Sequence, residues 1–174
     1  MTKNRALWLI AAALLLAALA AAGCTPYQYK GTVLDPPKPL DDFSLPAADG
    51  GTFRLSDQQA RLVLVYFGYT HCPDVCPATM YQVGQAVDQL GEDADRVQVV
   101  MVTVDPARDT PEQLDRYVKN FNPAFVGLRT DDTAELDTLL ADFGAFYQIE
   151  DAPEDSASGY LVTHTASLFL VDSQ

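Results

Sequence analysis

Two cysteines, Cys72 and Cys76, stand four residues apart, directly after the apolar run from Leu62 to Phe67. The run predicts a buried strand and the thiols the start of a helix. On a first helical turn, residues i and i+4 share a face with Cβ atoms ~5–6 Å apart, so both sulfurs can point at one atom. That distance suits a metal ion and is long for a disulfide, whose Cβ atoms prefer about 3.8 Å. Because dithiol oxidoreductases more commonly use Cys-x-x-Cys, the pair predicts a soft-metal or redox site, with metal favoured.

His164 is the candidate third ligand, since it lies in the approach to the last expected strand, Leu168 to Val171. A polar, ionisable side chain entering an apolar segment needs a partner, and imidazole suits copper. A histidine bonded only to backbone is the alternative. His71 competes for the role, but its position next to Cys72 directs it away from the helical face that the two cysteines share.

Two thiolates and one imidazole favour copper over zinc. Cu(I) accepts soft, three-ligand coordination, and Cu(II) accepts added nitrogen or oxygen donors. A structural zinc site takes a fourth protein ligand, and the one other cysteine of the sequence, Cys24, lies far away near the N-terminus.

The elements that must position these residues alternate between strands and helices. A hairpin is expected over 43–55, strands over 62–67, 97–104, 125–128 and 168–171, and helices after Cys76, from Thr110 and from Asp132. This order predicts an α/β sandwich with a mostly parallel central sheet. The functional crevice of such sheets lies beyond the carboxyl ends of the strands, where the two thiols are expected.

The first 23 residues read as an export segment, with Lys3 and Arg5 before an uncharged run of 18 residues that ends in Ala21-Ala22-Gly23-Cys24. This pattern resembles a bacterial lipoprotein signal, in which Cys24 receives the lipid and anchors the protein at the extracytoplasmic face of the membrane. An uncleaved N-terminal helix is the alternative, because 18 residues lie at the lower limit for spanning a bilayer. Residues 24–40, stiffened by Pro36, Pro37 and Pro39, are expected to be a linker and tether.

The charge of the chain argues against one class of partner. Its net charge is −13, with 24 acidic residues against 11 basic ones. Nucleic acid would require a basic stripe, so no nucleic-acid partner is expected.

The end of the sequence leads to a further expectation. The chain stops at Gln174, just after the last strand. We expect the C-terminal strand and helix to be truncated, about 25 residues in all, which would leave the final strand as an edge.

Three segments in the same order resemble the Sco/SenC family, copper proteins of thioredoxin-like fold that assist the assembly of cytochrome c oxidase. They are 67–77 (FGYTHCPDVCP), 104–111 (VDPARDTP) and 159–168 (GYLVTHTASL). The resemblance implies a thioredoxin-like Sco domain over 41–174. It also implies one copper per chain, as Cu(I) or Cu(II), with Cys72, Cys76 and His164 as ligands, and the copper site of oxidase subunit II as acceptor. Other copper chaperones or thiol reductants are further expected partners.

The leading hypothesis is therefore a metallochaperone with no catalytic residues. The alternative is an enzyme, a thiol–disulfide oxidoreductase in which Cys72 and Cys76 form the redox pair that keeps the cysteines of subunit II reduced. The two can coexist, because metal binds only the reduced pair. A thiol peroxidase of the same fold ranks third, because neither its threonine two positions upstream of Thr70 nor an activating arginine is found beside the thiols.

Overall fold

The computed structural model describes residues 8, 29–151 and 159–172. Residues 40–174 form a compact unit, and its elements in chain order are β1 (Ser44–Pro46), β2 (Thr52–Arg54), the 3-10 helix η1 (Leu55–Gln58), β3 (Leu62–Gly68), α2 (Val75–Gln89), the 3-10 helix η2 (Gly91–Arg96), β4 (Val97–Thr103), α3 (Pro111–Lys119), β5 (Val126–Leu128), α4 (Thr133–Phe143), β6 (Tyr147–Asp151), β7 (Tyr160–His164) and β8 (Leu168–Val171). The expected α/β architecture is confirmed.

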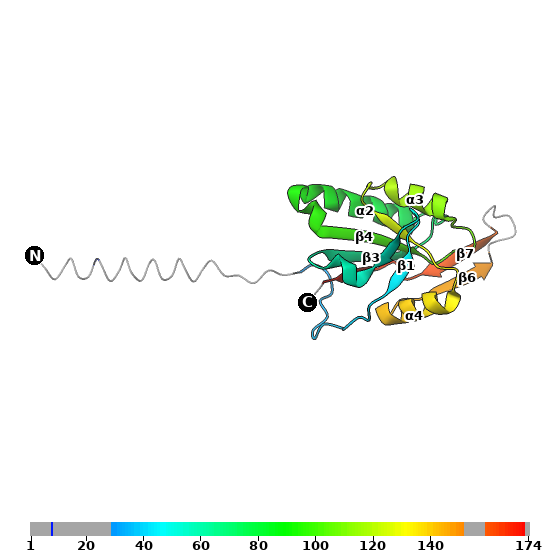
Figure 1. Cartoon of the computed structure of the whole chain (residues 1–174), viewed down its shortest axis with the longest axis horizontal. Helices are drawn as coiled ribbons and strands as arrows, with labels where there is room; N and C mark the ends of the chain where they lie inside the picture. Colours follow the sequence, from blue (N-terminus) through cyan, green and yellow to red (C-terminus); the bar gives the residue numbers. More distant parts are fainter. Residues whose placement is uncertain (1–7, 9–28, 152–158, 173–174) are drawn as a thin grey trace, which may run out of the picture. The chain divides into compact units, whose positions relative to one another are not determined.

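The central sheet has four strands in the order β5-β4-β3-β8. β3 pairs in parallel with β4, and β4 with β5, whereas β8 runs antiparallel to β3. α2 connects β3 to β4 and α3 connects β4 to β5, and both helices lie on the same face of the sheet, as the right-handed rule for such connections predicts. α4 covers the other face (Figure 1). On that second face, the Phe67 ring packs edge-on against Phe143 of α4, with centroids 5.4 Å apart. The mostly parallel sheet predicted from the sequence is therefore confirmed.

Local sequence signals explain where the helices begin and end. Thr110 and Gln113 form the predicted capping box at the start of α3, each side chain bonding the other residue's backbone. The side chain of Asp132 accepts hydrogen bonds from two backbone amides at the start of α4. Gly144 ends that helix with a φ of 64°, a left-handed conformation that favours glycine. The predicted hairpin is formed by β1 and β2.

The helix after the thiols ends just before a glycine. Leu90 continues the helical spacing of the buried residues Met80, Val83 and Val87, but it is the C-cap of α2 and is 44% exposed. From Gly91 the chain continues directly into η2.

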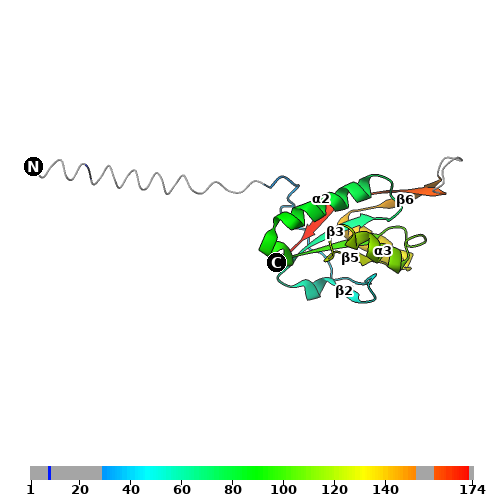
Figure 2. The same ribbon diagram turned by 90° about the horizontal axis from the view of Figure 1, so that it is seen from above.

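The sequence analysis also missed the hairpin β6–β7. These two strands pair only with each other among the described residues, in an antiparallel register that sets Tyr147 opposite His164. His164 therefore ends a strand of its own, separate from β8. Figures 1 and 2 show this hairpin at the end of the sheet where α2 begins.

Candidate metal centre

The loop between β3 and α2 is held by one buried carboxylate. The side chain of Asp109 is fully buried and accepts hydrogen bonds from the backbone amide and hydroxyl of Thr70, at 3.0 and 2.6 Å, and from the hydroxyl of Thr103 at 2.6 Å. Nδ1 of His71 lies 3.2 Å from the same carboxylate. Because a buried carboxylate is costly unless its lone pairs are bonded, these contacts keep the loop in one position over the sheet edge.

The two thiols meet at the first turn of α2, as the spacing predicts. The amide of Cys76 donates to Sγ of Cys72 at 3.4 Å. Cys76 is fully buried and Cys72 is 9% exposed, so Cys72 is the more accessible of the two buried residues. Both cysteines are unbonded thiols in this structure.

Cys76 lies directly on the backbone of β3. A Cβ added at Gly68 would stand 2.8 Å from the ring of Tyr66, which is shorter than real Cβ contacts, and only 3.0 Å from Sγ of Cys76. The absence of a side chain at Gly68 is therefore what admits the sulfur to this position.

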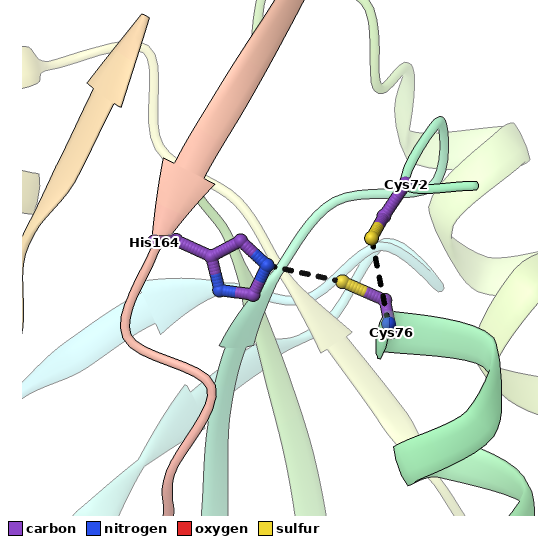
Figure 3. A group of neighbouring side chains, drawn as sticks. All are labelled: Cys72, Cys76 and His164. Atoms are coloured by element: carbon purple, nitrogen blue, oxygen red, sulfur yellow. Dashed lines mark hydrogen bonds between the residues drawn. The ribbon is translucent and has the colours of Figure 1, made fainter. Parts of the chain in front are cut away.

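His164 reaches the thiols from the end of β7 (Figure 3). Its Nε2 lies 3.3 Å from Sγ of Cys76, and the ligand atoms of Cys72, Cys76 and His164 all lie within 4.8 Å of one another. Nδ1 of His164 lies 3.1 Å from the carbonyl oxygen of Thr165, which can only accept, so Nδ1 carries the proton. Nε2, the other ring nitrogen, therefore faces the sulfurs, which is the orientation that a metal ligand requires.

Two tyrosines wall this site, as expected. The rings of Tyr66 and Tyr69 are buried and stand edge-on to the His164 ring, with centroids 6.1 and 5.7 Å away. Burial raises the pKa of Tyr66, so its hydroxyl remains protonated beside Cys76.

The two thiols differ in acidity. The hydrogen bond from Cys76 is the main cause that lowers the pKa of the Cys72 thiol well below its ordinary value, with smaller help from nearby backbone amides. The same hydrogen bond and burial raise the pKa of Cys76. The pair therefore loses its first proton from Cys72. The second proton stays on Cys76, whose S–H group points at the Cys72 thiolate.

The structure brings together Cys72, Cys76 and His164, the three residues predicted as ligands. His71, the competing candidate, is bonded to Asp109 instead. His71, Asp105 and Asp109 form a second group with ligand atoms within 4.8 Å, but the Asp109 oxygens are already occupied by hydroxyl and amide donors. Cys24, predicted to carry the lipid, lies outside the described residues.

The sequence analysis missed the role of Asp109. It belongs to the segment 104–111 that carries the family resemblance, yet nothing in its sequence context distinguishes a buried anchor from a turn aspartate. Asp105, in the same segment, is also buried and accepts hydrogen bonds from Tyr160 and Arg108.

Comparison with known proteins adds relatives of the whole domain. Residues 34–174 match the family model described as SCO1/SenC. A SCO2-like protein of Rickettsia prowazekii is 35% identical over 133 residues, 71% of this chain and 64% of that protein. The chain thus spans less than two thirds of the length of the first curated relatives that it matches.

Two solved structures share the fold. Apo Sco1 from Thermus thermophilus is 42% identical, with a TM-score of 0.72 over 86% of this chain and 84% of that chain. Bradyrhizobium japonicum ScoI, solved with copper bound, is 32% identical, with a TM-score of 0.68 over 76% of this chain and 82% of that chain. The predicted thioredoxin-like α/β class is confirmed by this likeness.

The lowered pKa of Cys72 leads to a prediction about its reactivity. Alkylation of an ordinary thiol slows tenfold per pH unit below its pKa of about 8.5, because only the thiolate reacts. In the reduced, metal-free chain we expect Cys72 to react at a nearly constant rate between about pH 8 and pH 5, since its thiolate persists as the pH falls. Iodoacetamide labelling followed by peptide mass spectrometry measures the rate at each cysteine.

The Cys76→Ala variant is the control, because it removes the sulfur that donates to Cys72. In that variant the reactivity of Cys72 should fall with decreasing pH, as it does for an ordinary thiol. A steep fall in the unaltered chain would contradict the assigned acidity.

Proposed function

The chain belongs to the SCO1/SenC family, and we propose that it is a copper metallochaperone, tethered at the outer face of a bacterial membrane, that delivers copper to the copper centre of cytochrome c oxidase subunit II. The observation that carries the proposal is the approach of His164 Nε2 to within 3.3 Å of Cys76 Sγ, beside a second thiol. The oxidase as acceptor follows from the resemblance of the three sequence segments.

The chemistry of the donors supports copper as the cargo. Two thiolates and a neutral imidazole are soft to intermediate ligands that suit Cu(I), and Cu(II) can add an oxygen or nitrogen donor. Binding through both sulfurs requires the pair to release its remaining proton, so affinity should rise with pH. Hydrogen bonding at His164 Nδ1 orients the third donor before any ion arrives.

The partial exposure of the site supports transfer more than storage. Cys72 is 9% exposed, while Cys76 has no exposed surface and lies against β3 at Gly68. A ligand from an acceptor can therefore reach a copper ion at the Cys72 side before Cys76 releases it, which keeps the ion bound throughout.

The tether is part of the proposal and rests on the sequence of residues 1–24. The lipoprotein-like signal and the lone Cys24 support lipid anchoring, with an uncleaved helix as the alternative. Within the ranges 8, 29–151 and 159–172, no helix combines the length and hydrophobicity needed to cross a membrane.

Thiol–disulfide exchange is the second candidate function, and the acidity of Cys72 favours it. Exchange needs an attacking thiolate and a resolving thiol. The lowered pKa of Cys72 suits it to the first role, and the protonated Cys76 suits the second. In this role the pair would keep the cysteines of the oxidase subunit reduced.

Copper titration tests the proposed ligands. We expect the reduced chain to bind one Cu(I) per molecule, the Cys72→Ser and Cys76→Ser variants to lose tight binding, and His164→Ala to weaken it by at least about tenfold through loss of one donor. Competition with a chromophoric Cu(I) chelator measures each affinity. The matched control is His71→Ala, which removes the other histidine, one bonded to Asp109. If His71→Ala weakens binding while His164→Ala does not, the ligand assignment is wrong.

Removal of His164 should also separate the two candidate functions. The variant His164→Ala keeps both thiols, so we expect it to exchange with a small dithiol at a rate within a few-fold of the unaltered chain. The same variant should fail to support oxidase assembly in cells, because copper is held less well. If assembly survives His164→Ala and fails only when both cysteines are replaced, reductase activity is the physiological role.

Mass spectrometry of the full-length protein from a bacterial host tests the anchor. We expect a mature chain that begins at a lipid-modified Cys24, because the residues before it are small and cleavable. The Cys24→Ser variant should lose the modification. An unmodified Cys24 still joined to Gly23 would favour the uncleaved helix.

A further inference from the structure

We propose that Asp105, Arg108 and Tyr160 form a latch that positions His164 at the metal centre, so that retention of copper depends on a cluster that never contacts the ion. The inference rests on the proposed function, in which His164 is the third copper ligand. These three residues are positioning residues, with no part in the thiol chemistry.

The hairpin that carries His164 needs such an attachment. β6 and β7 form a two-stranded sheet separate from the central sheet, and a two-stranded hairpin is marginally stable by itself. Both thiols, in contrast, sit on a loop and helix held by Asp109 to β4. The distance between Cys76 and His164 therefore depends on what holds β7 to the body of the domain.

The latch supplies that attachment through a buried carboxylate. The hydroxyl of Tyr160 donates to Oδ1 of Asp105 at 2.6 Å, and Nε of Arg108 donates to Oδ2 at 2.5 Å. Nη1 of Arg108 donates to the backbone oxygen of Tyr160 at 3.0 Å, and the guanidinium lies 3.6 Å from the centre of the Tyr160 ring. Asp105 is 2% exposed, so these charge-assisted bonds act away from solvent, where they are strong.

The geometry of β7 connects the latch to the ligand. Tyr160, Val162 and His164 alternate onto the same face of the strand, which spans about 13 Å between the first and the last of them. Val162 is buried between the two ends. Displacement of Tyr160 therefore shifts the strand that carries His164.

Tyr69 makes a second connection between the latch and the ligand. Its ring centre lies 5.7 Å from the Arg108 guanidinium and 5.7 Å from the centre of the His164 ring. Because Tyr69 belongs to the thiol loop, the latch fixes β7 relative to the loop as well as to β4.

A double-mutant cycle on the reduced full chain tests the proposal. Tyr160→Phe removes only the hydroxyl and keeps the ring on which Arg108 stacks. We expect it to raise the Cu(I) dissociation constant about tenfold, the effect of one lost hydrogen bond to a buried charge. In the His164→Ala background the same substitution should leave the dissociation constant unchanged, because no third ligand remains to be positioned. Arg108→Lys, which keeps the charge and loses the two-pronged contact, should show the same dependence on His164.

The matched control is Tyr147→Phe, which removes a tyrosine hydroxyl from the strand opposite His164 but outside the latch. It should bind Cu(I) as the unaltered chain does. The Cu(II) form gives a second readout, since Tyr160→Phe should shift its electron paramagnetic resonance spectrum towards that of His164→Ala.

Two outcomes would overturn the latch. The first is a Cu(I) dissociation constant that Tyr160→Phe leaves unchanged. The second is a loss of Cu(I) affinity on Tyr160→Phe that is equally large in the unaltered chain and in the His164→Ala background. If His164→Ala alone binds Cu(I) unchanged, the proposed ligand set fails, and the latch fails with it. If His164→Ala weakens binding and Tyr160→Phe does not, only the latch is wrong.

Discussion

The carboxylate of Asp109 is the contact on which the position of the thiols depends. This carboxylate accepts hydrogen bonds from Thr70 of the thiol loop and from Thr103 of β4. The backbone oxygen of Asp109 accepts a further hydrogen bond from Arg129 at 2.9 Å. A charge buried this completely is tolerated only when every segment that supplies a donor stays in place. The loop cannot shift without uncovering the charge, and α2 starts where the loop ends. The same contact holds His71 away from the sulfurs and leaves the third position to His164.

The central sheet and its helices could be predicted from the sequence because their signals are local. The apolar runs of β3 and β4, the capping box at Thr110 and the left-handed Gly144 each report on a few neighbouring residues. The thiol pair was likewise visible from its spacing. The hairpin β6–β7 was not, because its strands mix acidic and polar residues with apolar ones and are stabilised by contacts with distant segments. The contact of His164 with Cys76 spans 88 positions, and no local pattern encodes it.

The unequal thiols explain why one site can suit two kinds of chemistry. In the exchange that we propose as the second candidate function, the Cys72 thiolate would attack a disulfide while Cys76 still holds its proton, and Cys76 would lose that proton only when it resolves the mixed disulfide. Metal binding, in contrast, would require both sulfurs to be deprotonated at the same time. His164 would contribute only to metal binding. The division between the two activities therefore lies in a side chain from a separate hairpin, so the reactive pair can remain the same for both.

The missing side chain at Gly68 has a stereochemical consequence. Any side chain at this position would meet the Cys76 sulfur, the Tyr66 ring and the Met101 side chain, all of them buried, so β3 or its neighbours would have to move to make room for it. In the metallochaperone that we propose, an acceptor would approach from the side of Cys72, since Cys72 is 9% exposed and Cys76 has no exposed surface. A single glycine would then set the side from which the site exchanges its ligands.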